Sequence, residues 1–137
     1  LQSNKVKFLP GLFDFIHSLD NEKLANKISD EQKNKNWHPK IFIQVNIGNE
    51  TQKSGIKVEQ VENFVKFCKE LKLNIIGLMC IPPINEDPEK SFLRMNYLNK
   101  KMNFNELSMG MSADYLSAIE YKSTYLRIGS EIFGERV

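Results

Sequence analysis

The segment LSMGMSAD, residues 107–114, indicates how this chain folds. It begins like a buried β-strand, passes through Gly110, and ends with Ser112 and Asp114, two residue types that favour the start of a helix. A strand that runs directly into a helix is one half of a β-α-β unit. A glycine and a hydroxyl at a strand end also have a second use, because they let backbone N–H groups approach a phosphate.

The same alternation of strand and helix runs through all 137 residues. Apolar, β-branched segments predict five strands, with the chain starting on a strand, at residues 15–20, 39–47, 74–81, 106–112 and within 124–134, which holds the last strand and its exit. Apolar residues at helical spacing predict four helices, at residues 21–36, 57–72, 87–103 and 113–121. The order predicts an α/β fold with a parallel sheet, and the length suits a single domain over residues 1–137.

Composition excludes several classes of protein. The chain is 41% hydrophobic and 26% charged, values typical of globular domains, and its net charge of +2 is spread along the sequence. We therefore expect no nucleic-acid partner and no membrane partner, since apolar runs such as 74–83 are much shorter than a spanning helix. Cys68 and Cys80 do not form a metal-binding pattern and are interpreted as buried, reduced thiols of a cytoplasmic protein.

Two consecutive strand ends carry the strongest signal for a ligand. Functional sites in parallel α/β sheets gather where the carboxyl ends of the strands meet. One such end holds Gly110 and Ser112, and the next reads Arg127, Ile128, Gly129, Ser130. Glycines leave room for a ligand near the backbone, and serine hydroxyls donate hydrogen bonds. These ends predict a phosphate site, with Arg127 reaching toward the rest of the ligand.

A purely structural interpretation of the same residues stays open at this point. Ser112 followed by Asp114 is also a good helix N-cap with an acid in the first turn, and Gly129 is acceptable in any tight turn. A negative Asp114 also opposes phosphate binding unless its side chain faces away.

The remaining candidates are weaker. His17, at the end of the first strand, is either a general base or a structural residue, and Asn46 either bonds a ligand or caps its own loop. KSGI (53–56) is interpreted as a loop at the rim of the sheet, and Trp37 as surface packing in a polar loop. The sequence shows no paired carboxylates at strand ends and no metal-ligand spacing, so no catalytic or metal-binding residue is assigned.

Longer stretches resemble a known family. The segment 107–137 closely resembles the C-terminal signature of the pyridoxal phosphate homeostasis proteins, the YggS-type family. LQSNKVK (1–7), IFIQVNI (41–47), KSGI (53–56) and GLMCIPP (77–83) also follow in the order that this family shows.

The resemblance implies an alanine-racemase-like (β/α)8 TIM barrel that binds pyridoxal 5′-phosphate (PLP) and takes part in intracellular PLP homeostasis without established turnover. It implies that Ser112, Gly129 and Ser130 hold the phosphate and that Arg127 approaches the pyridine nitrogen. A cation there disfavours protonation of the ring and weakens it as an electron sink.

The resemblance also shows a departure. In the family, the lysine that forms the Schiff base lies on the first strand, ahead of the segment that LQSNK (1–5) matches, and no lysine here matches its motif. We therefore expect this chain to be the C-terminal part of such a barrel, incomplete and without the covalent anchor. Its unpaired strand edges should either promote self-association or leave a flattened, open sheet. Two alternatives remain: an alanine-racemase-like PLP enzyme, and a phosphate-binding α/β module unrelated to vitamin B6.

Overall fold

Six strands form the centre of the molecule. The computed structural model describes residues 1–51 and 53–136. The strands are β1 (Phe15–Leu19), β2 (Lys40–Asn46), β3 (Ile56–Lys57), β4 (Asn74–Met79), β5 (Glu106–Met111) and β6 (Tyr125–Arg127). Five of them pair in parallel in the order β1-β2-β4-β5-β6, and the short β3 pairs with β2 beside this path. The predicted parallel α/β sheet of five main strands is confirmed.

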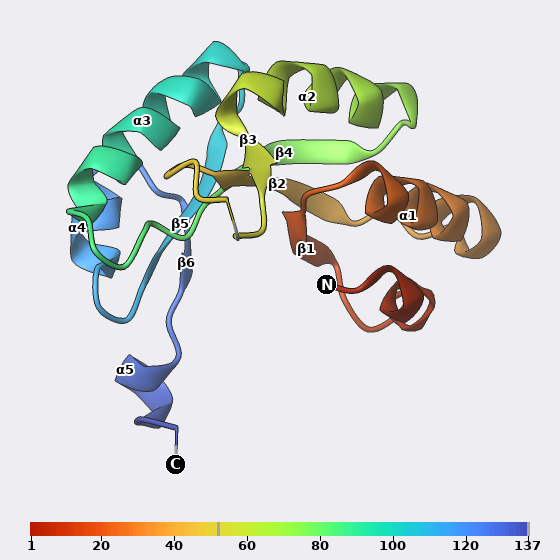
Figure 1. Cartoon of the computed structure of the whole chain (residues 1–137). Helices are drawn as coiled ribbons and strands as arrows, with labels where there is room; N and C mark the ends of the chain where they lie inside the picture. The colour runs from red at the N-terminus through yellow and green to blue at the C-terminus, as the bar shows by residue number, and fades with distance from the viewer. Residues whose placement is uncertain (52, 137) are drawn as a thin grey trace.

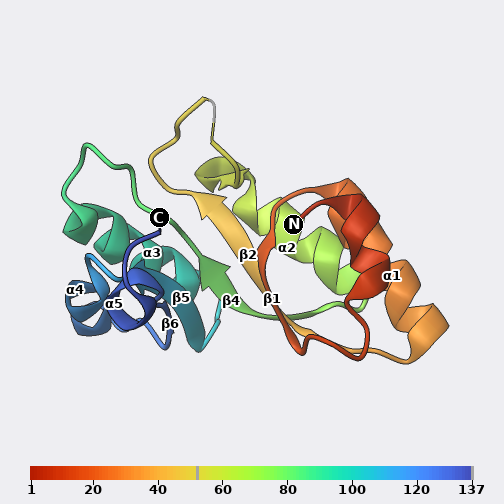
Figure 2. The same cartoon turned by 90° about the horizontal axis from the view of Figure 1, so that it is seen from below.

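Helices connect the strands and cover one side of the sheet. They are α1 (Glu22–Lys35), α2 (Val61–Glu70), α3 (Pro88–Lys101), α4 (Tyr115–Glu120) and the short α5 (Ser130–Phe133), with 3₁₀ turns at Ser3–Phe8 and Val58–Gln60. Helices α1 to α4 form an arc around the strands, and the opposite side of the curved sheet is open (Figures 1 and 2). Among residues 1–51 and 53–136, no helix combines the length and the apolar character needed to cross a bilayer.

Local sequence explains where these helices begin. The Asn21 side chain accepts a hydrogen bond from the Leu24 N–H at 2.8 Å, which caps α1. Asp87 caps α3 in the same way, by accepting from Glu89, and Pro88 occupies the first turn, where its missing N–H costs nothing.

The core lies between the arc of helices and the outward face of the sheet. The sheet supplies fully buried aliphatic side chains such as Ile41 and Leu78, and the helices supply Ile28 and Phe92. Both cysteines are buried in this part of the molecule and unpaired, and burial raises the pKa of each thiol to about 12. The predicted buried thiols are confirmed.

Several predicted boundaries were wrong. A 3₁₀ turn at Ser3–Phe8, held by the buried Val6, precedes the first strand. The predicted helix 57–72 is shorter, because β3 and a 3₁₀ turn occupy residues 56–60. Residues 124–134, predicted as the last strand and its exit, form a strand of three residues, and the exit turns into the short helix α5, which was not predicted. Trp37 is buried rather than on the surface, and its indole N–H donates to the Phe13 carbonyl at 2.8 Å.

Candidate functional site

The carboxyl ends of β5 and β6 meet at the Ser112 hydroxyl. Ser112 directly follows β5, and Gly129 and Ser130 follow β6. The backbone N–H of Gly129 donates to Ser112 Oγ at 3.2 Å, and the N–H of Glu131 donates to the same oxygen at 3.0 Å. The structure therefore brings together two loops that the sequence separates by 17 residues.

Ser112 is not the cap of the helix that follows it. Helix α4 begins at Tyr115 with Asp114 in the N-cap position, and Asp114 turns back to accept from the Met111 N–H at 2.8 Å. The Ser112 oxygen accepts two N–H groups, so its own hydrogen is left as a donor. The negative charge of Asp114 was the argument against a phosphate here. In the structure this carboxylate accepts its hydrogen bond from the last residue of β5.

The two glycines of this site have different functions. Gly110 has a φ of +104°, and a Cβ there would lie 2.8 Å from Ala118 Cβ and 3.0 Å from Leu126 Cδ2. This glycine lets α4 pack against the sheet, so its interpretation as a point of ligand approach was wrong. Around Gly129, by contrast, an added Cβ would meet no atom within 4 Å. Gly129 therefore borders open space beside the Ser112 hydroxyl.

Arg127 lies half-buried at the end of β6. Its Nη2 donates to the Cys80 carbonyl at 2.7 Å, while its Nε is buried and has no hydrogen-bond partner among the described residues. Burial lowers the pKa of Arg127, although a guanidinium stays charged at neutral pH. The guanidinium is thus anchored at the end of β6, the strand that leads into Gly129 and Ser130.

His17 belongs to a cluster on the open face of the sheet that the sequence did not reveal. Its Nδ1 lies 2.8 Å from Ser108 Oγ, and its ring stacks on Phe42 with centroids 4.5 Å apart. Tyr125 closes the cluster, 5.8 Å from the His17 ring. The available signal was Ser108 itself, a polar residue that alternates with Leu107 and Met109 and so faces the other side of the strand.

We expect His17 to make the protein less stable in mild acid. Burial, and secondly the charge of Arg127, lower the pKa of His17 below its ordinary value of 6.5. The unfolded chain therefore binds a proton at His17 more readily than the folded chain does. The contribution of His17 to the free energy of unfolding is fully present above pH 6.5 and is lost as the pH falls below that value. Melting temperatures between pH 7.5 and 5.5 should fall more for the native chain than for His17→Gln, where this site does not titrate. Parallel curves would contradict the assignment.

The loop after β2 has a structural function. Asn46 Nδ2 donates to the Glu50 carbonyl at 2.6 Å, and its Oδ1 accepts from the Glu50 N–H at 3.1 Å, so Asn46 caps its own loop. Gly55, with a φ of +114°, packs against the Asn46 backbone, and its N–H donates to Asp20 Oδ2 at 3.0 Å. KSGI thus joins the rim of the sheet. No cluster of three potential metal ligands occurs in the part of the chain that the structure describes.

Comparison with known proteins identifies the family of the chain. The model of the family described as "Alanine racemase, N-terminal domain" matches residues 3–137. The chain belongs to this family. It is 39% identical over 146 residues to the pyridoxal phosphate homeostasis protein of Aquifex aeolicus, and 33% identical over 149 residues to that of Escherichia coli K12. The predicted resemblance is confirmed.

A solved structure supports the same relationship. PipY of Synechococcus elongatus with PLP bound superposes with a TM-score of 0.88 at 28% identity, covering 98% of this chain and 67% of PipY. The alignments cover 99% of this chain but 64% of the Aquifex protein and 62% of the Escherichia coli protein. The chain thus spans less than two thirds of the length of these relatives.

Proposed function

We propose that this chain binds PLP and serves in PLP homeostasis in the cytoplasm, without catalysing turnover. The relatives from Aquifex aeolicus and Escherichia coli are named pyridoxal phosphate homeostasis proteins, and the PipY structure contains PLP. The free thiols of Cys68 and Cys80 fit a reducing compartment.

The observation that carries the proposal is the meeting of two strand ends at Ser112. Its hydroxyl has a hydrogen left to donate, and open space lies beside Gly129. Ser130, the exposed first residue of α5, adds a second hydroxyl after β6. A phosphate that entered here would find hydroxyl donors and unhindered backbone, which is the usual composition of a phosphate site late in an α/β barrel. Ser112, Gly129 and Ser130 are accordingly proposed to hold the phosphate.

Arg127 is proposed to face the pyridine nitrogen. Its Nη2 is fixed on the Cys80 carbonyl, so the guanidinium is held in place at the end of β6, next to the proposed phosphate residues Gly129 and Ser130. Bound PLP supplies an electron sink whose strength depends on protonation of that nitrogen. A fixed cation opposes this protonation and weakens the electron sink, which suits a carrier or a racemase-like site better than a transaminase.

We further propose that binding by this chain is non-covalent. The long strands of the sheet hold one lysine, Lys40, at the amino end of β2, where its Nζ lies 5.5 Å from the Phe15 ring. The proposed phosphate residues follow the carboxyl ends of β5 and β6. Lys40 therefore lies at the opposite end of the parallel strands, where their amino ends meet.

The proposal also covers assembly. Residues 1–137 are proposed to form one domain that contributes five main strands to an alanine-racemase-like barrel. In the described part of the chain no strand pairs with the outer edge of β1 or of β6. Such edges favour self-association of the chain when it is alone.

Substitution of the two serines tests the site. Ser112→Ala and Ser130→Ala should each weaken PLP binding by about 1.5–3 kcal/mol, the value of a hydrogen bond to a charged group. Calorimetric titration with PLP, repeated with inorganic phosphate as competitor, measures the loss. Ser117→Ala is the matched control, because Ser117 lies on α4 and bonds Glu89.

Two results would refute parts of the proposal. Unchanged affinity in both serine variants would exclude the phosphate assignment. Borohydride reduction followed by mass spectrometry should leave the mass of the chain unaltered. A stoichiometric adduct on one lysine would refute the non-covalent mode and would favour a racemase-like enzyme instead.

A further inference from the structure

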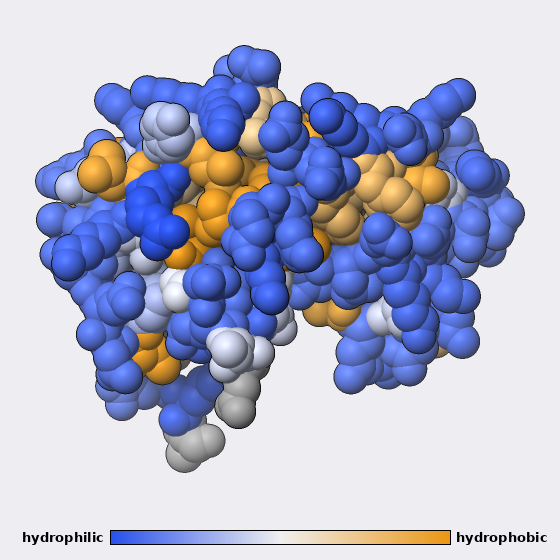
Figure 3. All heavy atoms as spheres, turned by 45° about the horizontal axis from the view of Figure 1, so that its top comes forward, coloured by the Kyte–Doolittle hydropathy of each residue, from blue (hydrophilic) through white to orange (hydrophobic). Residues whose placement is uncertain are grey.

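A groove on the outer surface of the molecule lies away from the proposed cofactor site. It separates α2, with the 3₁₀ turn before it, from α3, and its volume is about 660 Å³. Figure 3 shows apolar surface exposed between these helices. Strands β2 and β4 pass beneath this region in the middle of the sheet, so strands added beyond β1 or β6 would not cover the groove.

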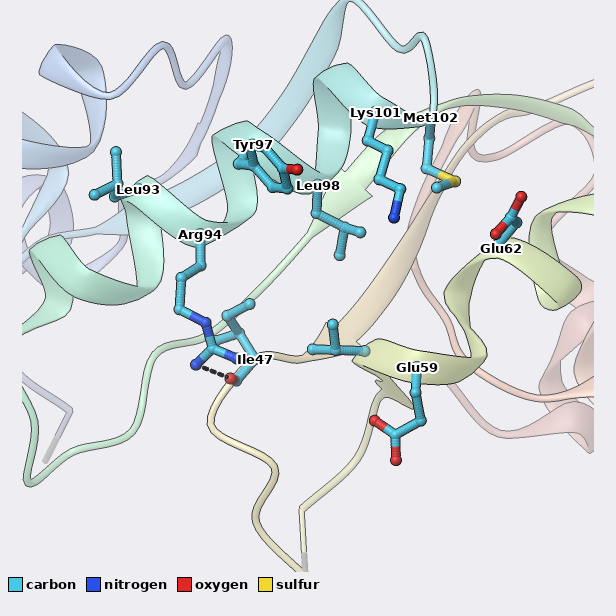
Figure 4. A pocket seen from close by; sticks show the side chains of 10 residues that line it. Ile47, Glu59, Glu62, Leu93, Arg94, Tyr97, Leu98, Lys101 and Met102 are labelled. Carbon is cyan, nitrogen blue, oxygen red and sulfur yellow. Dashed lines mark hydrogen bonds between the residues drawn. The ribbon is translucent and has the colours of Figure 1, made fainter.

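The floor of the groove is apolar and lies along one face of α3. Ile47, Val58, Leu98 and Met102 line it. The lining residues of α3 extend from Leu93 to Met102, which at 1.5 Å per residue is about 14 Å. Figure 4 shows the α3 side chains along this length. A trough between two helices with this length suits another helix, whose apolar residues repeat every three to four positions.

Large side chains that are typical of protein interfaces border the trough. The amphipathic Tyr97 is 71% exposed, and the apolar Leu93 is 58% exposed. Tyrosine, arginine and methionine are enriched in interfaces, and this groove holds Tyr97, Arg94 and Met102 together.

The two rims carry opposite charges. Glu59 and Glu62 lie on the α2 side, while Arg94 and Lys101 lie on α3 across the groove (Figure 4). Arg94 is fixed, because its Nη1 donates to the Ile47 carbonyl at 2.9 Å. Within residues 1–51 and 53–136 none of the four forms an ion pair. An occupant with basic groups on one flank and acidic groups on the other would satisfy both rims.

From this geometry we propose that the α2–α3 groove binds an amphipathic helix of a partner protein. The helix places an apolar stripe on Leu98 and Met102, a basic flank against Glu59 and Glu62, and an acidic flank against Arg94 and Lys101. The groove gives the protein a contact with another polypeptide that does not depend on PLP.

Designed peptides of about 16 residues, long enough to form a helix, test the proposal. Peptide KE has leucines at i, i+3, i+4 and i+7, lysines on one flank and glutamates on the other. Peptide EE has glutamates on both flanks, and a third peptide replaces the leucines of KE by serine. The native chain should bind KE about fivefold more tightly than EE in a fluorescence anisotropy titration, and it should not bind the serine peptide.

A charge variant makes the test independent of peptide direction. Glu59→Lys with Glu62→Lys makes both rims basic and should reverse the preference, so that EE binds about fivefold more tightly than KE. Asp30→Lys with Glu120→Lys adds the same charge at exposed positions outside the groove and should leave the native preference intact. Circular dichroism verifies the fold of each variant.

Three outcomes would overturn the proposal. The first is equal binding of KE and the serine peptide, and the second is an unchanged preference in the Glu59→Lys, Glu62→Lys variant. The third is a dimer of the chain alone, seen in sedimentation, that this variant dissociates, because a second copy would then be the occupant.

Discussion

Replacing Gly129 by valine should weaken PLP binding about 100-fold while leaving the stability of the protein unchanged. The backbone at Gly129 has a negative φ of −122°, outside the left-handed region that requires glycine, and an added Cβ would meet no atom within 4 Å. The valine side chain would therefore enter the open space beside Ser112. A phosphate excluded from that space loses two or more charge-assisted hydrogen bonds, each worth about 1.5–3 kcal/mol.

Calorimetric titration with PLP and thermal unfolding without it measure the two halves of this prediction. Gly129→Ala should give an intermediate loss of affinity, because its single methyl group fills less of the space. Equal affinity in the glycine, alanine and valine proteins would show that the phosphate does not bind here. A large drop in melting temperature in the valine protein would show instead that the loop depends on glycine.

The parts of the fold that local sequence determines were predictable. Buried strands such as residues 41–47 are rich in β-branched and aromatic residues, and α2 carries its buried residues at helical spacing, so each pattern identifies its element without tertiary information. The alternation of these elements then implies a parallel sheet and places the carboxyl ends of β5 and β6 together.

Structural features that depend on contacts between residues far apart in the sequence could not be predicted from local patterns. The two-residue strand β3 exists because Gly55 fits against the backbone of Asn46, and no local pattern indicates that packing. The burial of Trp37 depends on an acceptor, the Phe13 carbonyl, that lies 24 residues away. Gly110 looked like a ligand contact because the sequence does not show that α4 folds back onto it.

In the candidate site, too, some features could be predicted from local sequence and others could not. Ser112 and Gly129 stand out because their residue types at strand ends suit a phosphate, and the structure places them together. The pairing of His17 with Ser108 was missed, because it joins β1 to β5 across a sheet whose curvature is not encoded in either segment.

Replacing Gly77 by alanine should cause the largest loss of stability, about 3 kcal/mol. Gly77 lies in β4, opposite Phe42 of β2 and Glu106 of β5. An added Cβ would overlap the Glu106 carbonyl oxygen, lie 2.7 Å from the Glu106 carbonyl carbon, and lie 3.1 Å from the Phe42 ring. The obstacle is backbone of the neighbouring strand, so no side-chain rotation relieves it, and β4 and β5 must separate.

Separation of these strands would also break the buried connection between α3 and the sheet. Asn99 accepts from the Leu78 N–H at 3.0 Å and donates to the Glu106 carbonyl at 2.9 Å, so this one side chain joins β4 to β5 beside Gly77. Urea unfolding compares Gly77→Ala with Gly11→Ala, whose glycine has a φ of +84° and no atom near an added Cβ. The Gly11 variant should lose only about 1 kcal/mol, from backbone strain. If Gly77→Ala lost no more than this control, β4 and β5 would not pair as closely as the structure shows.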